Sequence, residues 1–408
     1  MKRYQWMGIM LSLVLLLCSC GTDKEVEKKA GESTSTPSAT ASVTPLISED
    51  EAFSEAEKIV KTMTIEQKVG QMFLVDLLQL DASPSVDGTA YKATDSMKQA
   101  IIDYHLGGVY LTKENIKSQK QTKKLVQNLQ ASVVSGSALY VAVEEDGGGE
   151  NSISAKVEDL KDTGYVTPKE MGQNMTANQI YESGKTIAGE LTKIGINLNL
   201  APVADLASDQ NPSYAMRCLG SDADGVADLL DDFVSGMREG GLSVTLKTFP
   251  GIGNVSADVT ESIAENTDSL MTIRDTNFVP YASGIQAGAD CVMVSNDAYS
   301  KLTVKKVPAF MSQDIVTKLL REELGFDGIV MTSPLNDNVI ENNYTNEFAV
   351  VEAVKAGCDL IVLPGNFKEC YEALITAVEE GRIDEKVINT SVRRILQNKI
   401  QRGILVLE

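Results

Sequence analysis

Short apolar runs alternate with longer amphipathic segments from about residue 51 onward. Apolar runs without polar alternation are typical of parallel strands that are covered on both faces. Between these runs, apolar residues recur with helical spacing, for example over 116–133 and 222–241. The eight runs that we predict to be strands are 71–77, 107–111, 139–143, 197–203, 243–247, 290–295, 328–332 and 359–363.

The last amphipathic segment is the clearest helix. Asp384 is placed to cap its N-terminus and Gly403 to end it. Eight strands alternating with helices predict an α/β fold, a (β/α)8 TIM barrel, with an open doubly wound sheet as the alternative. One i, i+4 row of the last helix contains Val387, Ser391, Ile395 and Lys399, and the apolar row beside it contains Val392, Leu396 and Ile400.

Composition and charge narrow the class of partner. The 408 residues are 43% apolar and 23% charged, as in an ordinary globular protein. The net charge of −20 and the lack of clustered Lys and Arg argue against a nucleic-acid partner. We expect no cofactor and no metal, because the sequence has neither a phosphate-binding P-loop motif nor Cys/His sets with metal-ligand spacing. His105, the single histidine, precedes the second predicted strand, and we expect it to be a surface or packing residue.

The first twenty residues are organised as an export signal. Lys2 and Arg3 precede an apolar segment, Met7 to Leu17, that is too short to span a bilayer. The ending "LCSC" resembles a bacterial lipobox, in which Cys20 would be lipidated after cleavage; a plain signal peptide is the alternative. We therefore expect a signal peptide at 1–19, a lipidated tether at 20–50, and a barrel domain at 51–408. The protein would then be exported, facing outside the cytoplasm, with its N-terminal lipid in the bacterial cell membrane.

Four further cysteines lie beyond the tether. An exported protein can form disulfides, but these cysteines show no close pair and no regular spacing. We expect buried free thiols and a monomeric protein. The four are Cys218, Cys291, Cys358 and Cys370.

Polar residues follow the predicted strands where function is located in a barrel, at the carboxyl ends. Acidic side chains with one arginine and one lysine suit a polyhydroxylated ligand, although any one of them can equally be an ordinary loop residue. The residues are Glu144, Glu145, Asp146, Asp205, Arg217, Lys247, Asn296, Asp297, Ser333, Asp337, Gly365 and Asn366.

Several motifs, taken in order over residues 55–405, together resemble glycoside hydrolase family 3. They include "MTIEQKVGQMFLV", "LGGVYLTKENI", "VEEDGG", "GINLNLAPVADLAS", "LKTFPGIG" and "LREELGFDGIVMTSPL". The similarity is to the single-domain bacterial β-N-acetylhexosaminidases of this family, and it also implies a (β/α)8 barrel.

The resemblance implies a retaining hydrolysis of β-linked amino sugars by an aspartate nucleophile and a histidine acid/base. In this chain the nucleophile position is Ser333. The acid/base position is Thr260, although its partner aspartate is retained as Asp258. The histidines of the family's K-H-F-P-G-H-G motif correspond to Thr248 and Ile252. Both reacting groups are therefore substituted.

The resemblance also implies a group of substrate-binding residues. Arg217 and Lys247 match the family's sugar-contacting cations. Glu144 stands in place of an aspartate that bonds sugar hydroxyls, Asp146 replaces a glutamate, and Thr248 is part of the same motif as Lys247. The positions that recognise a sugar are altered less than those that react with it.

Three hypotheses follow from this pattern. The first is a lipid-anchored, catalytically degenerate protein that binds amino-sugar glycans or cell-wall fragments. The second is an active glycosidase with relocated carboxylates, drawn from Asp146, Asp258, Glu261, Asp297 and Asp337. The third is a structural or partner-binding lipoprotein without a glycan site.

Overall fold

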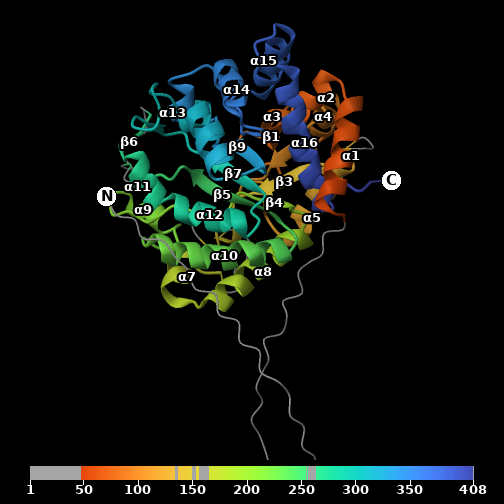
Figure 1. Ribbon diagram of the computed structural model, residues 1–408. Coiled ribbons are helices and arrows are strands. Elements are labelled where there is room, and N and C mark those ends of the chain that lie inside the picture. The colour runs from red at the N-terminus through yellow and green to blue at the C-terminus, as the bar shows by residue number, and fades with distance from the viewer. Residues whose placement is uncertain are drawn as a thin grey trace, which may run out of the picture. The chain divides into compact units, whose positions relative to one another are not determined.

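Parallel strands form the centre of the fold, as Figure 1 shows. The computed structural model describes residues 47–133, 137–148, 153–155, 165–253, 255 and 263–407. The strands of the central sheet are β1 (Phe73–Asp76), β2 (Gly108–Tyr110), β3 (Tyr140–Val143), β4 (Leu198–Asn199), β5 (Ser243–Phe249), β7 (Cys291–Val294), β9 (Ile329–Thr332) and β10 (Ile361–Val362). Each lies within or overlaps one of the eight predicted runs, so the strand prediction is confirmed.

The sheet closes into a barrel. Its strand order is β10-β1-β2-β3-β4-β5-β7-β9, with every pairing parallel. A parallel bridge between Met331 of β9 and Leu360, just before β10, joins the two ends of this order. The fold is therefore a (β/α)8 barrel, and the open doubly wound sheet is excluded.

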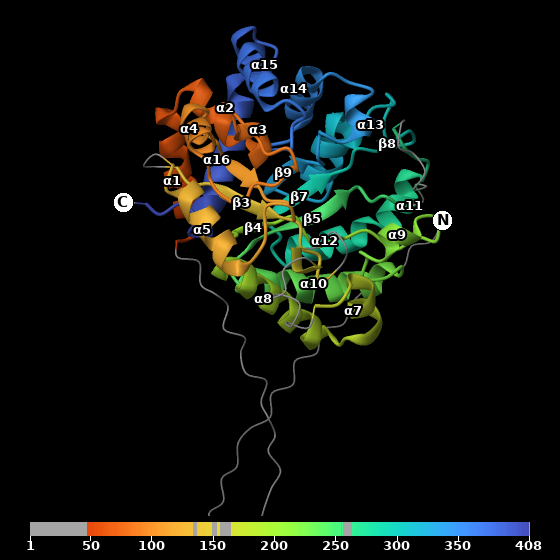
Figure 2. The ribbon, with the colours of Figure 1, turned by 180° about the vertical axis from the view of Figure 1, so that it is seen from behind.

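Helices surround the barrel on its outside (Figures 1 and 2). They are α1 (Glu49–Thr62), α2 (Ile65–Gln71), α3 (Leu77–Leu80), α4 (Asp95–Asp103), α5 (Gln119–Gln130), α7 (Pro168–Asn174), α8 (Ala177–Lys193), α9 (Pro212–Ala215), α10 (Ala223–Glu239), α11 (Leu270–Asp275), α12 (Phe278–Gln286), α13 (Asn338–Glu341), α14 (Asn346–Ala356), α15 (Phe367–Glu379) and α16 (Glu385–Gln401). The 3-10 helices η1 (Ile153–Ala155) and η2 (Ala309–Met311) and the π-helix η3 (Asp314–Glu323) complete the set in the described ranges.

Local sequence explains where these helices begin. Thr64, Thr167 and Thr176 each cap a helix, and each is answered by Gln or Glu three residues later in a reciprocal capping box. Asp384 caps α16 as predicted, by accepting a hydrogen bond from the backbone of Lys386. In the i, i+4 row of α16 that begins at Val387, this first residue is 37% exposed, whereas the three residues that follow it in the row are buried.

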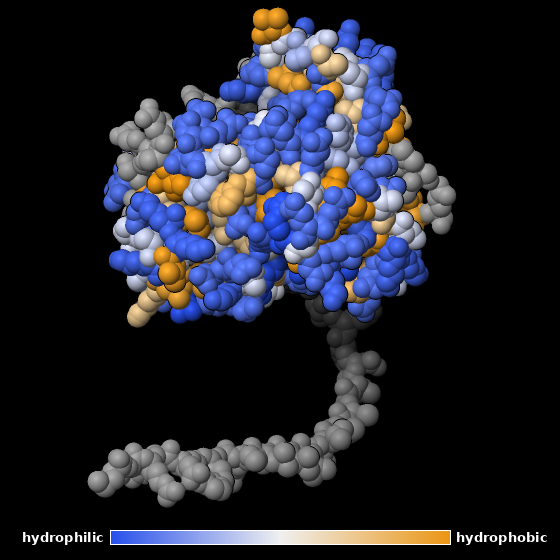
Figure 3. Space-filling model, turned by 90° about the horizontal axis from the view of Figure 1, so that it is seen from above, coloured by the Kyte–Doolittle hydropathy of each residue, from blue (hydrophilic) through white to orange (hydrophobic). Residues whose placement is uncertain are grey.

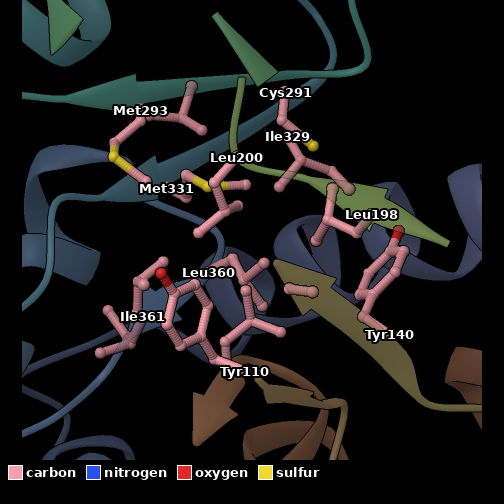
Figure 4. Packing of buried hydrophobic residues seen from close by; sticks show 14 of the residues in the cluster. Tyr110, Tyr140, Leu198, Leu200, Cys291, Met293, Ile329, Met331, Leu360 and Ile361 are labelled. Atoms are coloured by element: carbon pink, nitrogen blue, oxygen red, sulfur yellow. The ribbon is translucent and has the colours of Figure 1, made fainter. Parts of the chain in front are cut away.

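Side chains from alternate strand positions fill the barrel. Figure 4 shows Met293 and Met331 converging with Leu200 in this interior. On β3, the residues that share a face are Tyr140, Ala142 and then Glu144, because side chains in a strand alternate between faces. The same alternation runs from Ser243 to Lys247 on β5. Each of these strands therefore leads from the N-terminal end of the barrel to the mouth at its C-terminal end.

Helix α16 closes the N-terminal end. The Tyr140 hydroxyl donates to Asn398 Oδ1 at 2.7 Å, and Ser243 Oγ donates to the same atom at 2.9 Å. The fully buried Lys399 ammonium donates to Gln71 Oε1 at 2.9 Å and to the Gly107 carbonyl at 2.8 Å. One helix thus bonds to groups on or just before four strands of the barrel.

Two short strands were not predicted. β6 (Glu265–Asn266) pairs in parallel with β8 (Ala298–Tyr299) outside the barrel. Neither strand lies within a continuous apolar run of the sequence, so the pattern offered no signal. His105 lies before β2 as predicted, with a positive φ of 50°, and its carbonyl accepts from Gln71 Nε2 at 2.7 Å.

The remaining surface and core features bear on the earlier expectations. The four cysteines beyond the tether are buried free thiols. The face seen in Figure 3 is mainly hydrophilic, with apolar side chains in separate patches. No helix in the described ranges is long and apolar enough to cross a membrane. The predicted signal peptide, Cys20 and most of the tether lie outside the described residues, so these predictions stay open.

Candidate functional site

Four charged side chains meet at the C-terminal end of the barrel. Glu144 and Asp146 follow β3, Lys247 lies near the end of β5, and Arg217 follows α9. Because parallel strands all end at the same side of a barrel, residues about a hundred positions apart in the chain become neighbours there. We call these four residues the charge cluster, and they are four of the five residues predicted to bind substrate.

The charge cluster is held by short ion pairs. Lys247 Nζ lies 2.6 Å from Glu144 Oε1 and 3.0 Å from Asp146 Oδ1. Arg217 Nε donates to Asp146 Oδ2 at 2.7 Å, and its Nη2 donates to Glu144 Oε1. Lys247 also donates to the Leu200 carbonyl. Two cations and two carboxylates thus neutralise one another.

Electrostatics keep Glu144 ionised. Burial by itself would raise the pKa of this carboxyl, but the positive charges of Lys247 and Arg217 and their hydrogen bonds outweigh burial and lower the pKa to about 2. The Tyr110 hydroxyl at the end of β2 has a raised pKa, because it is buried and lies near the negative charges of Glu144 and Asp146. At neutral pH the cluster therefore presents a fixed carboxylate beside a neutral phenol.

The fifth predicted residue, Thr248, points to a different carboxylate. Its hydroxyl donates to Asp205 Oδ2 at 2.9 Å, and its backbone N–H donates to the same atom at 3.0 Å. Asp205 also accepts from Tyr214 at 2.7 Å and from Tyr281 at 3.1 Å. Burial raises the pKa of Asp205, although these hydrogen bonds oppose the rise. Thr248 is therefore part of a hydrogen-bond network centred on Asp205, and its predicted role in substrate binding stays a prediction.

Tyr214 connects the charge cluster to the Asp205 network. It was not predicted from the sequence. Its hydroxyl bonds Asp205, and its ring lies under the Arg217 guanidinium, with 5.6 Å between Cζ and the ring centroid. A tyrosine three residues before the predicted arginine, in a short helix, is a weak signal. Its placement depends on the fold of the loop after β4, which apolar periodicity does not describe.

Ser333 lies at the end of β9, on the other side of the mouth. It is buried, and its backbone N–H donates to the Val294 carbonyl at 2.9 Å. Near it, Asn296 donates to the Pro334 carbonyl at 3.0 Å and lies 3.5 Å from Asp337 Oδ2. The position that resembles the family nucleophile therefore carries a hydroxyl inside an ordered strand end.

Asp297, which follows β7, is a further acid with a perturbed pKa in this region. Burial raises its pKa to about 6, the nearby negative charges of Asp205 and Asp337 add to the rise, and a hydrogen bond from Ser295 at 2.9 Å opposes it. Perturbed carboxyls of this kind occur at functional sites and also in structural networks. Asp258, Thr260 and Glu261 lie outside the described residues, so their relation to Asp297 stays a prediction.

A small cavity of about 160 Å³ opens beside the charge cluster. Glu144 and Tyr110 line it, together with Lys113 and Ile153. In the described part of the chain, no group of three or more His, Cys, Asp or Glu side chains is arranged to hold a metal ion. What the site offers is a carboxylate and a guanidinium at fixed positions, an arrangement that can bond adjacent sugar hydroxyls.

Residues 64–398 match the model of the glycosyl hydrolase family 3 N terminal domain. The chain belongs to glycosyl hydrolase family 3. Among curated proteins, this family 3 chain is 26% identical over 369 residues to β-hexosaminidase A of Pseudoalteromonas piscicida, which covers 83% of this chain and 61% of the relative. It is 29% identical over 266 residues to a β-hexosaminidase of Xylella fastidiosa strain M23, covering 64% and 77% respectively.

Solved structures agree with this membership. A family 3 β-N-acetylglucosaminidase from Paenibacillus sp. str. FPU-7 superposes with a TM-score of 0.76 at 29% identity, covering 85% of this chain and 64% of that one. A β-N-acetylhexosaminidase from Beutenbergia cavernae DSM 12333 gives 0.72 at 29% identity, covering 83% and 98%. This chain thus spans about three fifths of some of these relatives and nearly all of another. The family resemblance to β-N-acetylhexosaminidases is confirmed.

Proposed function

We propose that this family 3 barrel binds β-linked amino sugars of cell-wall glycans at its C-terminal end and does not cleave them by the family's displacement route. The observation that carries the proposal is Ser333 at the end of β9, where the resemblance requires a carboxylate. A retaining glycosidase needs a carboxylate nucleophile about 5–5.5 Å from its acid/base. A hydroxyl without an adjacent base is a weak nucleophile and provides no negative charge for an oxocarbenium-like transition state.

The charge cluster supports binding of a sugar. Glu144, Arg217 and Lys247 stay together although the reacting positions have changed. The relatives named above are β-hexosaminidases and β-N-acetylglucosaminidases, which favours an amino sugar as the ligand. Thr260 stands at the acid/base position in place of the family histidine, so the second reacting group of the family route is also missing.

The site of action that we propose is the outer surface of the bacterial membrane. The support is the lipobox-like "LCSC" ending at Cys20 and the Ser/Thr/Pro-rich tether that follows it. Expression of the full chain with a labelled fatty acid should give a labelled membrane protein, and Cys20→Ser should abolish labelling. Export of an unlabelled soluble protein from the unmutated gene would contradict anchoring.

The test of binding without turnover uses the full chain in detergent. We expect no release of the aryl group from an aryl β-N-acetylglucosaminide, and measurable heats on titration with N-acetylglucosamine or muropeptides. Arg217→Gln should weaken that binding, because it removes a guanidinium from the charge cluster. Turnover that survives purification would contradict the proposal, as would the absence of binding to every sugar.

A second candidate function is glycoside hydrolysis through relocated carboxylates. Asp297 favours it, because a carboxyl with a pKa of about 6 is suited to act as a general acid, and because Asp337 is near enough to raise that pKa. If the protein hydrolyses the aryl glycoside, Asp297→Asn should lower kcat by at least about a hundredfold. Turnover unaffected by Asp297→Asn and by Asp337→Asn would exclude this function.

A further inference from the structure

Lys247 is surrounded by protein oxygens. Its ammonium group has three N–H donors. Nζ donates to Glu144 Oε1 and to the Leu200 carbonyl, and it lies 3.0 Å from Asp146 Oδ1. Only 4% of the side chain is exposed. The Lys247 amine is therefore buried and already hydrogen-bonded, so it is not available to a ligand at the barrel mouth.

Glu144 and Arg217 are the members of the charge cluster that face outward. Their side chains are 28% and 21% exposed, while Asp146 is as buried as Lys247. Glu144 Oε1 accepts from both cations, which holds the carboxylate in one orientation. Glu144 also lines the cavity that Tyr110 and Lys113 share. The parts of the charge cluster that a ligand can reach are thus the Glu144 carboxylate and the Arg217 guanidinium.

We propose that Glu144 determines specificity for uncharged sugars over their anionic derivatives, and that Lys247 is a positioning residue that acts through Glu144. The proposal rests on the glycan-binding function proposed above and deepens it. A hydroxyl or amide can accept from Arg217 while donating to Glu144. A ligand carboxylate would instead stand against the Glu144 carboxylate.

The charges in and around the charge cluster also suit a neutral ligand. The two carboxylates of the charge cluster offset its two cations. Around it, Lys113 lines the cavity and Asp76 is close enough to Tyr110 to influence its ionisation. Loss of the Glu144 charge would leave one carboxylate, Asp146, for two cations. The charge cluster would then be positive overall and would attract anions.

Three probes separate charge from bulk: N-acetylglucosamine, N-acetylmuramic acid, and the neutral amide of N-acetylmuramic acid. Binding of each to the full chain in detergent is measured by calorimetry at pH 7. We expect the amide to bind at least about tenfold more tightly than the acid, because the two are similar in size and only the acid carries a negative charge. Glu144→Gln should remove or reverse this preference. Glu144→Asp keeps the charge on a shorter arm, so it should keep the preference, and circular dichroism checks that each variant is folded.

The role of Lys247 is tested by a double-mutant cycle. If Lys247 acts only through Glu144, then Lys247→Met should change the amide-to-acid ratio in the native background and leave it unchanged when Glu144 is already Gln. A direct contact between Lys247 and the sugar would instead lower binding of all three probes equally in both backgrounds, and would overturn the positioning role.

The remaining outcomes are also distinguishable. Equal binding of the acid and its amide by the native chain would overturn the specificity assigned to Glu144 while leaving glycan binding intact. Failure of the native chain to bind any of the three probes would overturn glycan binding itself, and with it this inference.

Discussion

Buried carboxylates occur at both ends of the barrel, and their partners differ. Asp290 and Asp359 lie just before β7 and β10, at the N-terminal end. Asp290 pairs with Arg402 at 2.7 Å, and Asp359 pairs with Arg321 and, at 3.4 Å, with Arg394. Each also accepts a backbone N–H, from Val244 and Val330 respectively.

At the C-terminal end the carboxylates divide into two kinds. Those of the charge cluster have cations, but in the described part of the chain neither Asp205 nor Asp297 forms an ion pair with lysine or arginine. Burial raises the pKa of both. The N-terminal carboxylates hold helices to strands. At the other end, burial disfavours the ionised forms of Asp205 and Asp297, and perturbed carboxyls of this kind occur at binding and catalytic sites.

The largest effect is expected from breaking an N-terminal pair. Asp359→Ala leaves Arg321 and Arg394 without their shared carboxylate in a buried setting, which should lower the free energy of unfolding by about 3–5 kcal/mol. Urea denaturation measures it. As a control, Glu323→Gln breaks a surface pair with Arg274 and should cost at most about 1 kcal/mol. Equal losses in the two variants would remove the distinction between buried and surface pairs.

The next largest effect is a pH dependence of stability, and it comes from Lys399 at the N-terminal end of the barrel. Burial lowers the pKa of Lys399 from 10.5 to about 7. Between about pH 7 and pH 10.5 the unfolded chain therefore binds more protons than the folded one, so stability should rise with pH, by at most about 1.4 kcal/mol per pH unit. Lys399→Met should abolish this rise in denaturation curves taken across that range. A rise of unchanged slope in the variant would show that Lys399 is not its source.

A smaller effect of opposite sign is expected at the C-terminal end. The folded-state pKa of Asp297, about 6, lies above its ordinary value of 3.8. The folded chain binds the extra proton between these values, so the contribution of Asp297 to stability is greatest near pH 4 and is lost as pH rises to 6. In thermal unfolding, the stability of Asp297→Asn relative to that of the native chain should increase as pH rises over this range. A constant difference between the two would contradict a raised pKa.

Sequence patterns predicted the barrel well because its strands are continuous apolar runs. The run at 290–295 contains β7, and the run at 359–363 contains β10. They predicted the members of the charge cluster through strand ends and motifs. They did not predict its pairings, because the bonding of Arg217 to both Asp146 and Glu144 depends on side-chain geometry across the mouth.

Other features gave no usable signal in the sequence. The spacing placed Lys399 in an i, i+4 row of α16 beside the apolar row, yet nothing in the pattern indicated that its amine would be buried without a carboxylate partner. The Asp205 network depends on two tyrosines, from α9 and α12, that approach from separate loops and helices. Such contacts are tertiary, and local periodicity carries no information about them.

Helix α16 also has a consequence for the order of events during synthesis. Its Asn398 and Lys399 bond to Tyr140, Ser243 and the carbonyl of Gly107, all of which are translated more than 150 residues earlier. A ribosome-bound chain that has made every strand but not this helix has no partner for those groups. The barrel should therefore complete its folding only after this helix has been made, with the earlier strands exposed to chaperones until then.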